Sequence, residues 1–120
     1  MNISKNQPLS IEEKNIIQSA IDFAHPVNNA YDEDGEKYLQ LLKDKIVNED
    51  TVRFSDLISP AILIHLIPSL RRYKEIIKTN IAEPTNKESD VRLLQEKWRC
   101  CSNLIIILMD VAERLYGINL

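Results

Sequence analysis

The side chains of this chain that could perform chemistry are few, and their spacing completes no catalytic site. Asp22 and His25 stand one helical turn apart, like a carboxylate and an imidazole of a di-iron bundle, but such a bundle needs this motif twice and two further carboxylates. Cys100 and Cys101 have no histidine near them in sequence to complete a zinc site. We therefore predict that the protein is not an enzyme and holds no metal or cofactor.

Acidic residues are concentrated at positions 32 to 36, and their pattern can be compared with two kinds of metal site. If Gly35 is the sixth residue of a calcium loop, Ala30 and Leu41 fall at positions that need carboxylates, so the pattern excludes an EF-hand. Glu33 and Glu36 form the E-x-x-E pair that helical nucleotide pyrophosphohydrolases use for Mg²⁺, but no later E-x-x-D follows. The acids also outnumber those that stabilise a first helical turn, which favours a surface for a partner.

The thiols and the hydropathy pattern indicate where the protein works. Neighbouring side chains on a helix point about 100° apart, so Cys100 and Cys101 cannot form a disulfide with each other. The longest uncharged stretch, residues 57–70, is 14 residues long and holds two prolines, whereas a membrane span needs roughly 20 apolar residues. With no apolar leader before residue 10, we expect a cytoplasmic protein with reduced thiols.

Helix caps and apolar spacing predict the elements that hold these groups. A capping box of Ser10 and Glu13 opens a first helix that ends before the His-Pro pair, with Phe23 on its expected buried face. Asp34 is the expected N-cap of a second helix over about residues 35–47. The apolar face predicted for this second helix consists of Tyr38, Leu39, Leu41, Leu42 and Ile46.

Two longer helices complete the predicted set. Ser59 and Pro60 are typical of an N-cap and a first helical position, and the apolar spacing of this third helix continues through Pro68, where a kink is expected. Thr85 and Glu88 form a capping box for the last helix, which ends at a glycine. The apolar stripe of this last helix, which we call its seam, widens towards the C-terminus. We therefore expect the C-terminal half of the helix to be enclosed and the N-terminal half to protrude. The seam consists of Val91, Leu94, Trp98, Cys101, Ile105, Leu108, Ala112 and Leu115.

These signals predict an all-α fold: an antiparallel bundle of four main helices, the third kinked at Pro68, with a long C-terminal helix. Residues 1–9 are expected to form a flexible N-terminal segment, and residues 10–120 a single helical domain. Between the second and third helices, Val52 and Phe54 alternate with a polar residue as in a short strand. No second strand is visible to pair with them, so we predict a connector with room for one helical turn.

The distribution of charge constrains the partner. The chain carries 15 Lys and Arg against 18 Asp and Glu, a net charge of −3. Residues 1–58 hold 11 acids and 6 bases, whereas residues 59–120 hold 7 acids and 9 bases. An acidic chain is a poor ligand for nucleic acid, because phosphates attract clustered Lys and Arg. A protein partner with a basic surface fits this charge better.

In size, acidity and helical character the chain resembles the immunity proteins that protect bacteria from the nuclease domains of colicins and contact-dependent inhibition toxins. The resemblance spans the whole chain without a shared motif, so no functional residue is carried over. It implies an inhibitor that covers the basic cleft of a nuclease toxin with acidic side chains. The residues expected to bind this partner, with one of the tyrosines as anchor, are Tyr31, Asp32, Glu33, Asp34, Glu36, Tyr38, Glu49 and Asp50.

A second hypothesis is a small regulator or adaptor that associates with itself through the last helix. The chain is expected to be either a monomer or a weak homodimer. Ile106 lies at the centre of a polar face of that helix, so another element, a second subunit or solvent must cover it. Self-association would use Ile106 and the seam over residues 91–101. An enzyme whose site is assembled from residues distant in sequence is the third alternative.

Overall fold

The computed structural model describes residues 7–24, 33–49, 51–83 and 87–118; for Ala24 and residues 33–36 it describes the backbone alone. These residues form four α-helices and one 3₁₀ turn, and the described part of the chain contains no β-strand. The predicted all-α fold is confirmed. The elements are α1 (Ile11–Ala24), α2 (Glu33–Asn48), η1 (Phe54–Leu57), α3 (Pro60–Ile81) and α4 (Glu88–Tyr116).

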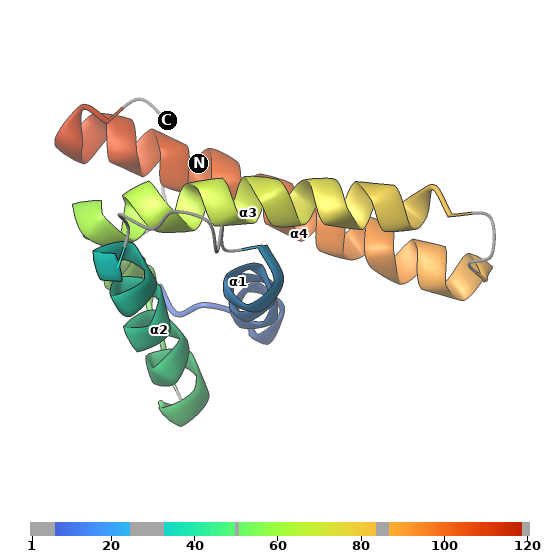
Figure 1. Ribbon diagram of the computed structural model, residues 1–120, viewed down its shortest axis with the longest axis horizontal. Coiled ribbons are helices and arrows are strands. Elements are labelled where there is room, and N and C mark those ends of the chain that lie inside the picture. Colours follow the sequence, from blue (N-terminus) through green and yellow to red (C-terminus); the bar gives the residue numbers. More distant parts are fainter. Residues whose placement is uncertain (1–6, 25–32, 50, 84–86, 119–120) are drawn as a thin grey trace.

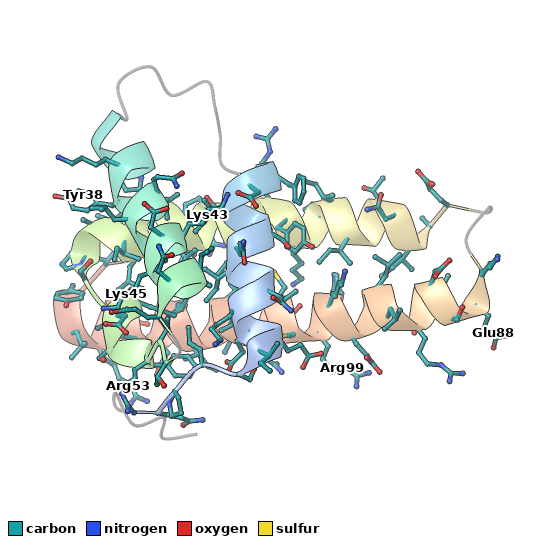
Figure 2. All side chains as sticks on the ribbon, turned by 90° about the horizontal axis from the view of Figure 1, so that it is seen from below. Tyr38, Lys43, Lys45, Arg53, Glu88 and Arg99 are labelled. Carbon is teal, nitrogen blue, oxygen red and sulfur yellow. The ribbon has the colours of Figure 1, made fainter. Side chains whose placement is uncertain are left out.

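Helices α3 and α4 lie side by side and antiparallel, and together they form a hairpin that spans the length of the molecule (Figure 1). Helices α1 and α2 pack on one side of this hairpin and cross it instead of running along it (Figures 1 and 2). The predicted antiparallel bundle of four helices is therefore not confirmed, because α1 and α2 cross the other two helices. None of the described helices has the length and hydropathy of a membrane span.

Helix α3 continues without interruption through Pro68, so the predicted kink is not confirmed. Proline removes the N–H that would bind the carbonyl of Ile64, and its exposed side chain lies away from the core. The next residue, Ser69, is buried, and its hydroxyl donates a hydrogen bond of 2.9 Å to the carbonyl of His65. Packing of the apolar face of α3 on both sides of Pro68 keeps the helix in one piece.

The ends of the helices follow the sequence signals in part. At the start of α1, the N–H of Ser10 donates to Glu13 Oε1 at 2.9 Å and the N–H of Glu13 donates to Ser10 Oγ at 3.1 Å, which confirms the capping box. Ser59 caps α3 as predicted, and Gly117 ends α4 in the left-handed conformation with φ of 63°.

Two predicted caps differ from the structure. Helix α2 begins at Glu33, so Asp34 lies inside its first turn and is not the N-cap. Lys87 occupies the N-cap position of α4, and Thr85 lies outside the described residues. Acidic side chains stabilise a first turn as readily as they cap it, so the sequence located the helix starts only to within a residue or two.

Residues 7–9 are held in place at the end of the segment that the sequence predicts to be flexible, and residues 1–6 of that segment lie outside the described residues. The N–H of Leu9 donates to the carbonyl of Val52 at 2.7 Å, and the N–H of Phe54 donates to the carbonyl of Gln7 at 3.0 Å. Leu9, Val52 and Phe54 are all buried. We call this pairing of residues 7–9 with residues 52–54 the clasp. Residues 7–9 thus pair with Val52 and Phe54, for which the sequence showed no partner strand. The 3₁₀ turn η1 confirms the expected helical turn in the connector.

The core lies where α1 and α2 cover the hairpin. Phe23 is 73% exposed, which corrects its predicted place on the buried face of α1. Because α1 crosses the hairpin, its last turn reaches the outer edge of α3 (Figure 2). The side chain of Phe23, in that last turn, is exposed. Tyr38 and Leu41 of α2 are likewise exposed, although Leu39, Leu42 and Ile46 are buried as predicted. The fully buried large side chains include Ile17, Leu39, Val52, Leu57, Leu63, Leu66, Ile67, Leu70, Cys101, Leu104 and Leu108.

The other half of the hairpin projects beyond α1 (Figure 1). We call this part, residues 74–81 and 88–100, the arm, and the rest of the described chain the enclosed half. No α4 residue before Cys101 is buried, whereas Cys101, Leu104 and Leu108 are. The prediction that the N-terminal half of the last helix protrudes is confirmed.

Candidate protein-docking site

A groove of about 790 Å³ lies where the first turn of α1 meets the middle of α4. We call it the docking groove. Residues of α4 three or four positions apart form one wall, because that spacing places side chains on one face of a helix. The clasp and the start of α1 form the other wall. The lining residues are Gln7, Ser10, Glu12, Glu13, Phe54, Glu96, Arg99, Cys100, Asn103, Ile106 and Ile107.

Two local features hold the walls of the docking groove in position. The capping box fixes the direction of the first turn of α1 and engages the carboxylate of Glu13 with the N–H of Ser10. The clasp holds Gln7 beside Phe54, whose ring is buried beneath the groove. Arg99 projects from α4 near the start of α1 (Figure 2). Both walls therefore rest on backbone hydrogen bonds near the core.

The apolar part of the docking groove centres on Ile106. This side chain is 66% exposed, and it lines the groove together with half-buried Ile107 and buried Phe54. The sequence placed Ile106 in the middle of a polar face, and no element of the described chain covers it. A large aliphatic side chain held open inside a hollow is a feature of surfaces that bind partners.

The charged rim of the docking groove is predominantly acidic, with Glu12, Glu13 and Glu96 against Arg99. Its negative charge acts on the thiol at the base of the groove. Burial raises the pKa of Cys100 to about 11, and the carboxylates of Glu12 and Glu13 contribute to the rise. Negative potential therefore reaches into the hollow as well as around it.

Neither cysteine is activated for nucleophilic chemistry. Burial and the neighbouring thiol of Cys100 raise the pKa of Cys101 to about 12, although Lys74 acts in the opposite direction. The thiol of Cys101 lies 3.2 Å from the carbonyl of Leu70, to which it donates a hydrogen bond. Because the thiolate is the reactive form, both cysteines serve packing. Among the residues described, no group of three His, Cys, Asp or Glu side chains is placed to hold a metal ion.

The acidic surface predicted from sequence is described only in part. Tyr31, Asp32 and Asp50 lie outside the described residues, and the backbone alone places Glu33, Asp34 and Glu36 in the first turn of α2. Tyr38 is 41% exposed and is thus accessible as an anchor, and Glu49 is exposed just after the helix. Glu36 and Glu49 are 13 positions apart, about 20 Å along α2, so these two acids lie at opposite ends of the helix, as the sequence predicts.

The acids at the C-terminal end of α2 are partly neutralised. Lys45 Nζ lies 2.8 Å from Asp56 Oδ1 and 3.6 Å from Glu49 Oε2. Asp56 Oδ2 also accepts the N–H of Arg53 at 2.9 Å. Burial favours the neutral acid, but the hydrogen bonds from Lys45 and Arg53 outweigh it and keep the pKa of Asp56 below its ordinary value. This end of α2 is therefore a weaker attractor for a basic partner than residue types alone suggest.

The acids of the docking groove were not among the predicted site residues. Glu12 and Glu96 are more than 80 positions apart in the chain, and no local spacing signals that α1 meets α4 there. Ile106 was recognised because an apolar residue on a polar helical face is visible in the sequence itself. The structure adds the hollow and the carboxylates around it.

Comparison with known proteins finds no matching family model, no similar curated protein and no similar solved structure.

Proposed function

We propose that this protein is a protein-binding inhibitor of the immunity type, which neutralises a nuclease toxin through an acidic surface. The observation that carries the proposal is the exposed Ile106, held in a hollow whose rim bears Glu12 and Glu96. Protein interfaces combine a few apolar anchors at the centre with a polar or charged rim that sets orientation. The docking groove has this composition.

The charge of the chain supports a basic partner. Residues 1–58, which include α1 and α2, hold 11 acids against 6 bases. A nuclease must present a positive cleft to bind the phosphates of its substrate. Opposite fields of this kind speed the encounter between two proteins and fix their register, while buried anchors determine the lifetime of the complex. The acids of the docking groove and those at the start of α2 would act together in this role.

The free thiols support action in the cytoplasm. Cys100 and Cys101 are both unpaired, and their raised pKa values keep them protonated at neutral pH. A protein with reduced cysteines suits a reducing compartment, where an inhibitor protects the cell that makes the toxin.

Self-association through α4 is the second candidate, favoured by the exposure of Leu93 (58%) as well as Ile106. These residues are 13 positions apart, which turns them roughly 140° around the helix, so one facing helix cannot cover both. Leu94 and Trp98 of the predicted seam already pack against the core. A homodimer would therefore rely on Ile106 with little support, which is why a different protein is the preferred partner.

The proposed function is tested by co-expression with the product of the neighbouring reading frame, where an inhibitor and its toxin are expected together. The chain should restore growth and elute with that product as a 1:1 complex. Ile106→Asp should weaken the complex about 100-fold, because a charge then lies at the centre of the interface. Leu115→Asp changes another exposed leucine-type position of α4, outside the groove, and should protect normally. Normal protection by Ile106→Asp would refute the role of the groove, and purification of the chain with nucleic acid would refute the function.

A further inference from the structure

A second hollow, of about 400 Å³, adjoins the docking groove on the side of α1 that faces the arm. We call it the side cleft. One wall is a polar stripe of α1 that includes Asn15, Gln18 and Ser19. The opposite wall is made by the hairpin, with Tyr73 from α3 and Leu93 from α4. The side cleft thus has mostly polar groups on the side of α1, and an apolar patch beside the charged Glu96 and Lys97 on the side of the hairpin.

The two hollows adjoin each other, because Glu12 and Glu96 line both of them. The docking groove lies at the start of α1, and the side cleft follows α1 towards its later turns. The two carboxylates come from different helices at this junction, and we call the two adjoining hollows together the path. The other charges are mixed within each hollow: Arg99 accompanies Glu13 in the docking groove, and Lys97 accompanies Asp22 in the side cleft.

We infer that this path binds an extended, basic segment of the partner protein. An apolar residue of the segment packs on Ile106, a lysine or arginine lies between Glu12 and Glu96, and a second apolar residue packs against Leu93 and Tyr73. This inference rests on the proposed function, since it names the part of the partner that the docking surface recognises. The carboxylates shared by both hollows set the position of the cation.

The dimensions of the path favour an extended chain. Ile106 and Leu93 are 13 residues apart on α4, about 20 Å along the helix axis and roughly 140° around it, so an extended chain needs six or more steps of about 3.3 Å to join them. Because the two side chains do not share one face of α4, a straight helix about 10 Å wide cannot contact both. An extended backbone also leaves N–H and C=O groups without partners. The amides of Asn15 and Gln18 and the hydroxyl of Ser19 can satisfy them.

The inference is tested by selecting binders of the full chain from a displayed library of random heptapeptides. The enriched sequences should carry lysine or arginine near the middle with an apolar residue three positions away on each side. Amide chemical shifts should then move in both hollows when a selected peptide is titrated. Enrichment of acidic or purely apolar peptides, or shifts confined to other surfaces, would overturn the inference.

Charge variants locate the cation on the path. The double variant Glu12→Lys, Glu96→Lys should weaken binding of the selected peptide about tenfold, and the milder Glu12→Gln, Glu96→Gln about threefold, as expected for exposed ion pairs. Glu113→Lys, on α4 outside both hollows, is the matched control and should bind normally. Thermal melting verifies that each variant is folded. Equal binding by the double variant and the control would refute the position of the cation.

The two proposals fail in different ways. If the wild-type chain gives no protection in co-expression but binds basic peptides along the path, the inhibitor function is wrong and the segment-binding surface stands. If protection is full and no basic peptide is enriched, the function stands and the inference about the path is wrong.

Discussion

The enclosed half and the arm are built from the same two helices, yet they differ in how deeply those helices are buried. Apolar residues follow the same spacing of three and four along all of α4. In the enclosed half this seam gives Cys101, Leu104 and Leu108, which have almost no exposed surface, whereas Leu94 and Trp98 in the arm are only half-buried. The spacing decides which side of a helix faces its neighbour. The depth of burial depends on how many further elements cover the pair, and α1, α2 and the clasp cover mainly the enclosed half. In the arm, Ile77 of α3 is buried, but no residue of α4 is.

The docking groove and the side cleft lie where these two regions meet. On one side of α1 the hairpin is covered, and on the other it continues alone as the arm (Figure 1). A concave corner arises at this boundary because the covered surface of the hairpin adjoins its uncovered surface. The same boundary leaves Leu93 exposed beside polar residues of α1. The candidate site thus follows from the place at which α1 crosses the hairpin.

The largest effect expected from this comparison is on stability. Leu108→Ala in the enclosed half should lower the free energy of unfolding by about 3 kcal/mol, because it leaves a cavity in a fully buried position. Leu94→Ala in the arm should cost about 1 kcal/mol, since solvent already reaches that site. Urea denaturation followed by circular dichroism measures both. Equal costs would show that the arm is packed as firmly as the enclosed half.

The sequence predicted the helices well because their signals are local. The capping box at Ser10, the Ser-Pro start of α3 and the glycine end of α4 each depend on a few neighbouring residues. How a helix lies on its neighbours is not a local property. A helical wheel groups Phe23 with Ile16 and Ala20, but it cannot show that α1 crosses the hairpin and carries Phe23 beyond the covered surface.

The candidate site was predictable only where one residue contradicted its own surroundings. Ile106 stood out as an apolar side chain on a polar face, and it lines the docking groove. Glu12 and Glu96 gave no such signal, because each is an ordinary charge on an amphipathic helix. They belong to the candidate site only because α1 contacts α4, and these two helices are far apart in the sequence. The clasp was missed for the same reason, since neither Leu9 nor Val52 forms a strand signal by itself.

A smaller effect on stability should appear in alkaline solution. It concerns Cys101, which marks the start of the enclosed part of α4. Its pKa of about 12 in the folded chain lies above the ordinary value of 9.0, so the unfolded chain releases this proton first. Stability is then full below pH 9 and falls as the pH rises towards 12. Between pH 8 and pH 10 the wild type should lose about 1 kcal/mol relative to Cys101→Ala, as measured by urea denaturation. If the stabilities of wild type and variant depended on pH in the same way, solvent would reach this thiol and the enclosed half would begin further along α4.

The smallest effect concerns the ion pair that ties η1 to α2 within the enclosed half. Asp56→Asn removes the charge that meets Lys45 and should cost about 0.5 kcal/mol at pH 7, because the carboxylate is only partly shielded from solvent. The folded chain lowers the pKa of Asp56 below 3.8, so its contribution is present above about pH 4 and is lost as the pH falls through that lowered value. Wild type and variant should therefore converge in acid. Asp110→Asn is the matched control, since the pair of Asp110 with Arg114 lies within α4 and joins no separate elements. If both variants cost the same at pH 7, the Lys45 pair does nothing to hold η1, and packing of Phe54 and Leu57 alone keeps this side of the enclosed half closed.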